Sequence, residues 1–80
     1  MADFVVRIPR VSVAISEAEL VDLLVADGAP VTEGEPLFVI ATDKVESEIL
    51  AGGTGVVRWS GSIGTVYEIG EEIGKIEATG

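Results

Sequence analysis

The sequence contains no cysteine and no histidine among its 80 residues. Without cysteine the chain has neither a disulfide bond nor a thiolate metal site, so burial of apolar side chains must provide its stability. The two absences also remove the commonest general base and the thiol nucleophile of enzyme active sites. The chain has no Gly-x-Ser-x-Gly, P-loop or Gly-x-Gly-x-x-Gly motif, and its acidic residues lack the spacing of a calcium-binding loop. Together these absences argue against catalysis and against a bound metal.

Positive charge is scarce. Five Lys and Arg residues stand against 14 Asp and Glu residues, which gives a formal net charge of −9. Proteins that bind nucleic acids or anionic membranes need cationic patches, so we expect neither partner. Two interpretations of the acidity remain open: a well-solvated surface, and electrostatic steering toward a basic partner protein.

Long apolar segments are absent as well. No run approaches the roughly 20 residues of a membrane-spanning helix, and the start of the chain, Met1 to Phe4, lacks the basic and apolar regions of a secretory signal. We therefore expect one small domain, residues 1–80, located in the bacterial cytoplasm. In a eukaryote, the mitochondrial matrix is the equivalent location.

Apolar and β-branched residues, by contrast, are abundant: hydrophobic residues make up 48% of the chain. They fall in short runs between ten glycines and three prolines, which indicates an all-β sandwich or barrel. The runs are Val5–Ile8, Leu20–Val25, Leu37–Ile40, Val45–Leu50, Val56–Trp59 and Ile73–Ile76. A helix over Glu17–Ala26 is an alternative, because Ser16 to Glu19 has the pattern of an N-terminal capping box. The spacing of the neighbouring runs favours a strand.

A shift of 36 residues brings two halves of the sequence into register. The matched pairs are Gly28 with Gly64, Val31 with Tyr67, Gly34 with Gly70, Leu37 with Ile73, and Ile40 with Ile76. Two copies are too few for a solenoid, so we predict two similar half-barrels related by a pseudo-two-fold axis. The glycines are expected in tight turns with positive φ, the apolar positions in a shared core, and residues 51–55 between the halves.

One lysine stands where a turn is expected. Asp43 and Lys44 separate the apolar run 37–41 from the strand-like run 45–50, which predicts a hairpin with Lys44 at its tip, opposite the C-terminus. Lysine replaces the glycine of favoured hairpin loops, although a type I turn accepts Asp-Lys without positive φ. A broken local rule is typical of a functional site, yet a merely solubilising turn lysine remains an alternative. The other lysine, Lys75, falls within the last run and is expected to be structural.

The stretch from Glu35 to Ala51, with the turn Asp43-Lys44-Val45, resembles the lipoyl attachment region of 2-oxo acid dehydrogenase acyltransferases. In that family the turn lysine carries lipoate, and an acidic residue follows four positions later, as Glu48 does here. The resemblance covers nearly the whole chain. Its further elements are Ile8-Pro9, the spacing of Gly28, Val31, Gly34 and Leu37, Gly55-Val56-Val57, and the closing pattern of Ile69, Gly70, Ile73 and Ile76. The family fold, a flattened barrel-sandwich hybrid of two antiparallel four-stranded sheets, is therefore the expected architecture and agrees with the repeat.

The resemblance also implies a function. Lys44 would carry lipoate through an amide, with Asp43 and Val45 presenting it to a lipoylating enzyme. The lipoyl group would take an acyl group from a thiamine-dependent 2-oxo acid dehydrogenase, pass it to an acyltransferase core and be reoxidised by dihydrolipoamide dehydrogenase. Tethering raises the effective concentration of the arm at each active site. The chain is then a monomeric, non-catalytic carrier domain, either excised from the N-terminus of an acyltransferase or freestanding.

The family further implies a partner-recognition loop beside the lysine hairpin. In this chain the loop corresponds to Ser12, Val13, Ala14, Ile15, Ser16 and Glu17. The family usually has glycine where Ser12 and Ala18 stand, and aspartate where Ala29 stands. These departures bear on which partner recognises the loop more than on lipoate attachment.

Three other functions compete with this interpretation. A biotin carrier shares the fold but attaches biotin within Met-Lys-Met, against which Asp43-Lys44-Val45 speaks. An unmodified β-barrel interaction module with an inert Lys44 is the second. An enzyme with carboxylate catalysis is the third, although no pair of acids gathers convincingly in the sequence. Among lipoyl systems, the pyruvate, 2-oxoglutarate, branched-chain and acetoin complexes share the motif.

Overall fold

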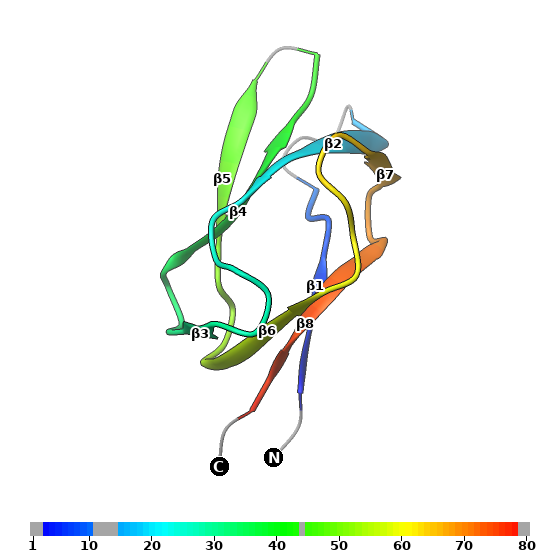
Figure 1. Ribbon diagram of the computed structural model, residues 1–80. Coiled ribbons are helices and arrows are strands. Elements are labelled where there is room, and N and C mark those ends of the chain that lie inside the picture. The colour runs from blue at the N-terminus through cyan, green and yellow to red at the C-terminus, as the bar shows by residue number, and fades with distance from the viewer. Residues whose placement is uncertain (1–2, 11–14, 44, 79–80) are drawn as a thin grey trace.

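A computed structural model describes residues 3–10, 15–43 and 45–78 of the chain. Within these ranges the chain forms two four-stranded antiparallel sheets and no helix, and thus nothing that would cross a bilayer as a helix. The strands are β1 (Phe4–Arg7), β2 (Glu17–Leu23), β3 (Pro30–Val31), β4 (Pro36–Ala41), β5 (Glu46–Leu50), β6 (Gly55–Trp59), β7 (Val66–Glu68) and β8 (Glu72–Glu77). One sheet has the order β1-β8-β6-β3 and is called the terminal sheet below; the other, β5-β4-β2-β7, is called the hairpin sheet (Figure 1). The all-β prediction is confirmed.

The helix considered for Glu17–Ala26 is absent, and a strand stands there. Along β2 the side chains of Ala18 and Leu20 are buried while those of Glu17 and Glu19 are exposed. This period of two belongs to a strand with one face on a core. The capping-box pattern is therefore overridden by burial of alternate residues against the opposite sheet.

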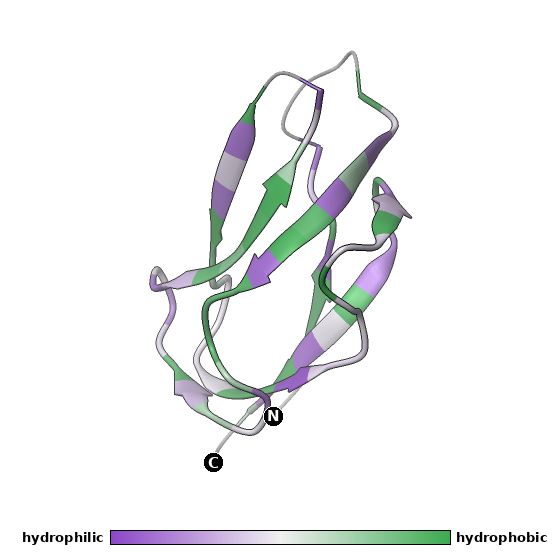
Figure 2. Cartoon of the chain, turned by 45° about the horizontal axis from the view of Figure 1, so that its top comes forward, coloured by the Kyte–Doolittle hydropathy of each residue, from purple (hydrophilic) through white to green (hydrophobic). Residues whose placement is uncertain are grey.

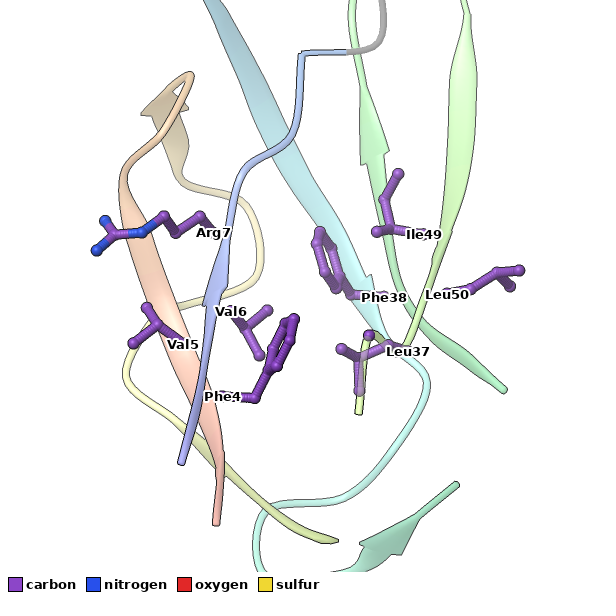
Figure 3. A pocket seen from close by; sticks show the side chains of 9 residues that line it. Phe4, Val5, Val6, Arg7, Leu37, Phe38, Ile49 and Leu50 are labelled. Carbon is purple, nitrogen blue, oxygen red and sulfur yellow. The ribbon is translucent and has the colours of Figure 1, made fainter. Parts of the chain in front are cut away.

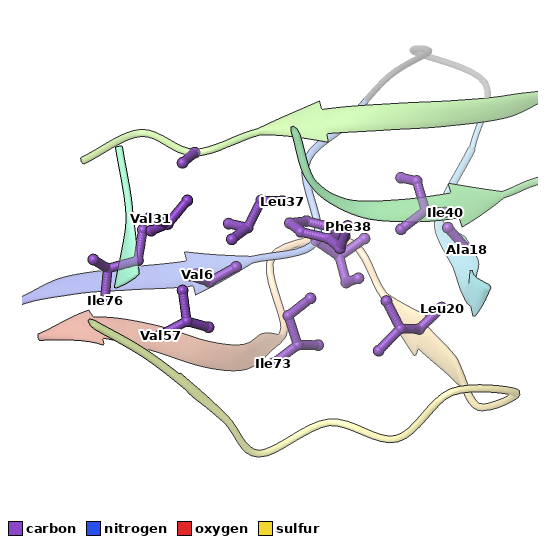
Figure 4. Close-up of a cluster of buried hydrophobic side chains, with 12 residues drawn as sticks. Val6, Ala18, Leu20, Val31, Leu37, Phe38, Ile40, Val57, Ile73 and Ile76 are labelled. Carbon is purple, nitrogen blue, oxygen red and sulfur yellow. The ribbon is translucent and has the colours of Figure 1, made fainter. Parts of the chain in front are cut away.

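The core lies between the two sheets (Figure 4). It consists of twelve buried apolar residues and, within the described chain, no buried polar or charged residue. Its members are Val6, Ile8, Ala18, Leu20, Val31, Leu37, Phe38, Ile40, Ala51, Val57, Ile73 and Ile76. The four Leu and Ile positions of the sequence repeat are all among them, as the repeat predicts.

The turns of the two sheets are equivalent, as expected for a pseudo-two-fold axis. The N–H of Gly28 donates to the carbonyl of Val57 at 2.7 Å, and the N–H of Gly64 donates to that of Leu20 at 2.7 Å. The pair Gly34 and Gly70 is equivalent, and all four glycines have φ between 85° and 91°. Because non-glycine residues rarely adopt this region, the repeated glycines are explained by the turns that precede and follow β3 and β7.

A β-bulge at Val21 breaks the repeat by one residue. Leu20 pairs with Ile40, and the equivalent pair in the other sheet is Val57 with Ile76. The sequence offset is therefore 37 in β2 but 36 in β4. The register of β2 shifts between Leu20 and Asp22, which restores the offset of 36 beyond the bulge.

The molecule is elongated, with principal-axis extents of 39 × 20 × 19 Å. The β4–β5 hairpin forms one end, and both ends of the chain leave from the other (Figure 1). β1 and β8 lie side by side there, with Phe4 opposite Ile76. The arrangement matches the expectation that the hairpin lies opposite the C-terminus.

Candidate functional site

The candidate site is the outer end of the β4–β5 hairpin. Ala41 pairs with Glu46, and the next residues are joined by a hydrogen bond of 2.8 Å from the N–H of Thr42 to the carbonyl of Val45. The Thr42 hydroxyl also donates to this carbonyl, at 3.4 Å. Only two residues of the sequence lie between Thr42 and Val45, so the predicted hairpin is closed where the sequence places its loop. Lys44 itself lies outside the described residues.

The residues that flank Lys44 in the sequence restrict the type of turn and its surroundings. Asp43, like every described residue other than glycine, has a negative φ. The primed hairpin turns require positive φ at the first loop residue, so they are excluded here. Asp43 and Val45 are both exposed, Val45 at 53%. A group attached between two exposed residues does not have to displace any part of the fold.

Glu48, the acid four positions after Lys44, lies on β5 opposite Val39. Its side chain is exposed, as is that of Glu46 two residues earlier. Directly opposite residues of antiparallel strands point to the same face. Glu48 and Glu46 therefore lie on the outer face of the hairpin sheet, on the strand that leads away from the loop.

The expected recognition loop is described only in part, since Ser12, Val13 and Ala14 lie outside the described residues. The carbonyl of Ile15 accepts a hydrogen bond from Arg10 at 3.3 Å, and that of Ser16 accepts one from the N–H of Ile69 at 3.0 Å. Glu17 then begins β2, the strand beside β4. The segment thus enters the sheet next to the hairpin, and its role in partner recognition stays a prediction.

An apolar groove runs between the edge strands β1 and β5 (Figure 3). Phe4, Val6, Phe38 and Ile49 are among its lining residues. The only charged residue that lines it, Arg7, points away from it in Figure 3 and donates to the carbonyl of Gly70 at 3.0 Å. The groove therefore offers no converging polar groups to orient a ligand, and it lies along the part of β5 away from the hairpin end.

Ion pairs of the described chain gather on the terminal sheet. Arg58 contacts Glu77 at 3.1 Å, and Lys75 contacts Glu77 at 3.4 Å and Asp3 at 3.8 Å. The Arg58 guanidinium and then the Lys75 ammonium hold the pKa of the Glu77 carboxyl below its ordinary value of 4.5. Lys75 thus has a structural role, as expected from its position in the sequence. No group of three potential metal ligands occurs among the described residues.

Sequence reasoning missed Glu19 as a neighbour of the hairpin. It lies on β2 directly opposite Ala41, with Glu46 on the other side of the same alanine. The alternation of acids in Glu17-Ala18-Glu19 and Glu46-Ser47-Glu48 was visible in the sequence. It indicates one exposed face for each strand, but which residues become neighbours depends on the register.

Comparisons with known proteins converge on one family. The model of the biotin–lipoyl family, described as that of biotin-requiring enzymes, matches residues 5–76. The lipoamide acyltransferase component of the branched-chain alpha-keto acid dehydrogenase complex of Bacillus subtilis is 33% identical over 73 residues, which are 90% of this chain and 17% of that protein. The solution structure of the lipoyl domain of the 2-oxoglutarate dehydrogenase complex of Azotobacter vinelandii superposes with a TM-score of 0.79 at 27% identity, covering 96% of this chain and 99% of that domain. The chain thus spans about a sixth of the curated relative and the whole length of the solved domain.

Proposed function

Since this chain belongs to the biotin–lipoyl family, we propose that it is a lipoyl carrier domain of a 2-oxo acid dehydrogenase acyltransferase and that Lys44 bears the lipoyl group. The observation that carries the proposal is the hairpin closed by Thr42 and Val45, with a two-residue loop that contains Lys44 in the sequence. The similarity to a solved lipoyl domain and to an acyltransferase component supports lipoate over biotin as the attached group.

The residues around the loop fit a covalent arm. Asp43 and Val45 are exposed, so the described residues on either side of the attachment point do not enclose an arm attached there. Attachment forms an amide bond between the Lys44 Nζ and the carboxyl carbon of lipoate. One carboxyl oxygen leaves with the activating nucleotide, and the lysine ammonium gives up two of its three protons to the modifying enzyme or to water, while the third stays on the amide nitrogen. When bound, lipoate supplies a cyclic disulfide that accepts an acyl group and two electrons.

The domain contributes presentation and tethering. Both chain ends lie at the end of the molecule away from the hairpin (Figure 1), so linkers on either side leave the loop free to enter an active site. In this proposal the partners are a thiamine-dependent dehydrogenase, an acyltransferase core and dihydrolipoamide dehydrogenase. The bond-making chemistry belongs to these partners, and the carrier raises the local concentration of its arm at each of them.

Intact-mass measurement tests the proposal. The chain is incubated separately with a lipoate–protein ligase, lipoate and ATP, and with a biotin–protein ligase, biotin and ATP. We expect one lipoyl increment, its loss in Lys44→Arg and its retention in the matched variant Lys75→Arg. Circular dichroism of Lys44→Arg should equal that of the unaltered chain. A biotin increment instead would assign the chain to the biotin carriers, and no increment with either enzyme would overturn the carrier function.

A further inference from the structure

The two sheets differ sharply in charge. The strands of the terminal sheet contain three cations and two acids, which are Arg7, Arg58, Lys75, Glu72 and Glu77. The strands of the hairpin sheet contain no Lys or Arg and six acids, which are Glu17, Glu19, Asp22, Glu46, Glu48 and Glu68. All three ion pairs between described residues lie on the terminal sheet. Among the described residues, no ion pair engages the carboxylates on the outer face of the hairpin sheet.

The strand register brings these carboxylates together on one face of the sheet, next to the hairpin loop. One row crosses all four strands as Glu46, Ala41, Glu19 and Val66. Neighbouring strands lie about 4.8 Å apart, so the two glutamates stand about 10 Å apart on either side of a small residue. Figure 2 shows the hydrophilic bands that the acids form on β2 and β5. Val66, at 54% exposure, adds an apolar element to the row.

One pair on this face opposes the stability of the fold. Glu17 on β2 lies directly opposite Glu68 on β7, and like charges in this relationship are destabilising. A solubilising role does not require two acids to face each other, because the same charge could be placed anywhere on the surface. A destabilising contact that has no structural role is typical of a surface selected for contact with another molecule.

The position of the face specifies which partner must cover it. An enzyme that acts on Lys44 has to enclose the hairpin loop, and the row at Ala41 and Glu46 lies directly next to the Thr42–Val45 pair that closes this loop. A standard interface buries about 800 Å² on each partner, which is a patch about 30 Å across. The four strands of the hairpin sheet span only about 15 Å, so an interface of this size at the loop covers the whole width of the sheet. The inner face of the hairpin packs on the core, where Ile40 is fully buried, so the outer face is the one on which an enzyme can rest.

We propose that the outer face of the hairpin sheet is the docking surface for the enzyme that lipoylates Lys44, and that this enzyme meets Glu19 and Glu46 with arginine or lysine side chains. This docking surface rests on the proposed attachment at Lys44 and on complementary charge between the two partners. Opposite potentials on two partners accelerate encounter and orient it. The face therefore acts before the amide forms, by bringing the loop to the active site in one orientation.

Two double variants with the same net charge test this proposal. Glu19→Gln with Glu46→Gln removes the two carboxylates beside Ala41. The matched control, Glu33→Gln with Glu72→Gln, removes two exposed carboxylates outside the hairpin sheet. Both change the net charge of −9 by two. The rate of lipoyl transfer by a purified lipoate–protein ligase is followed by intact mass at several concentrations of the domain and from about 20 to 500 mM salt, and circular dichroism checks each fold.

We expect the Glu19 and Glu46 variant to lower kcat/KM about five- to tenfold at low salt, mainly through KM, because an encounter interaction is lost while the loop is intact. The control should stay within about twofold of the unaltered chain. Added salt should slow the unaltered chain and largely remove the difference, since the Debye length is about 10 Å at 0.1 M and shortens toward about 3 Å at 1 M. Equal rates for the two variants at low salt would overturn the docking surface and leave the carrier function standing. Absence of lipoylation in the unaltered chain would overturn both.

A direct binding measurement gives an independent readout. Titration of the ligase into isotope-labelled domain should shift the backbone amide signals of β2, β4, β5 and β7 and leave those of β6 and β8 unchanged. Shifts centred on the terminal sheet would contradict the proposal even if the variant slows transfer.

Discussion

Phe38 on β4 and Trp59 on β6 meet edge to face across the two sheets, with ring centroids 6.0 Å apart and ring planes at 81°. The 36-residue repeat relates Phe38 to Gly74. A Cβ atom at Gly74 would lie 2.7 Å from the carbonyl oxygen of Arg58 and 2.8 Å from Cε3 of Trp59, so the backbone of β6 and the tryptophan ring together occupy the space that a side chain there would need. The core follows the two-fold symmetry except at this place. Here the large Trp59 side chain fills the space that is left because Gly74 has no side chain.

Replacement of Trp59 by leucine should destabilise the domain by about 3 kcal/mol. The change makes Trp59 like its repeat partner Leu23, but it leaves a cavity beside Phe38 and removes the hydrogen bond of 2.7 Å from the indole N–H to the carbonyl of Val25. Urea denaturation followed by circular dichroism measures the loss. The exposed Leu24→Ala is the control and should cost less than about 1 kcal/mol. Equal losses in the two variants would contradict the packing role of Trp59.

Alanine at the repeated turn glycines should cost the same in both halves. Gly34 and Gly70 have φ of 91° and 89°, and nothing lies within 4 Å of a Cβ atom added at either. The backbone conformation alone then sets the penalty, about 1–2 kcal/mol. Gly53→Ala, which has an ordinary φ and a contact of 3.5 Å to the Phe4 ring, should be close to neutral. Chemical denaturation that separates Gly34→Ala from Gly70→Ala by more than about 1 kcal/mol would argue against equivalent turns.

Gly55→Ala should be far more disruptive than either turn variant. Its Cβ atom would overlap the carbonyl oxygen of Glu77 on β8. Here the barrier is the close approach of two strands, and we expect a loss of at least about 3 kcal/mol. The corresponding residue of β2 is Ala18, which is buried with 2% exposure and has room for its methyl group. Ala18→Gly should therefore cost only about 1 kcal/mol, and faster amide exchange in β8 should appear in Gly55→Ala alone.

The ion pairs of Glu77 should stabilise the domain only above the acid range. The pKa of Glu77 is lowered in the folded state by Arg58 and Lys75, so its contribution is present above the unfolded value, near 4.5. It is lost as the pH falls through the lower folded value. The difference in melting temperature between the unaltered chain and Glu77→Gln should be small and constant from pH 5 to 8 and should shrink below pH 4.5. The exposed pairs are screened by salt, so 1 M NaCl should reduce the difference at pH 7. A difference that grows toward low pH would have the wrong sign for this mechanism.

Sequence periodicity was sufficient for the all-β class, the paired glycine turns and the hairpin, because each depends on local residues. The repeated spacing of Gly28 and Gly64 predicts turns with positive φ. The apolar composition of the run before Asp43 predicts a strand. The two shortest strands, Pro30–Val31 and Val66–Glu68, were not predicted, since two or three residues cannot display an alternation.

Other features depend on register and packing, which a sequence read along its length does not contain. Trp59 and Gly74 lie on different strands. The reason for a glycine at position 74 is therefore apparent only when its neighbour across the sheet is known. The row of Glu46, Ala41 and Glu19 likewise combines three separate strands. A one-residue slip, such as the bulge at Val21 introduces, would place a different residue beside the hairpin.

The side-by-side arrangement of β1 and β8 has a mechanical consequence. Phe4 pairs with Ile76, so linkers pulling on the two ends of the chain would separate these strands like a zipper. The hydrogen bonds would then open one after another from the linker end, and the hydrogen bond from the N–H of Ala78 to the Asp3 carboxylate would be the first contact to carry the load. A domain held in this way yields to small forces at the end with the chain termini, while the opposite end, which bears the β4–β5 hairpin, keeps its shape until the core itself opens.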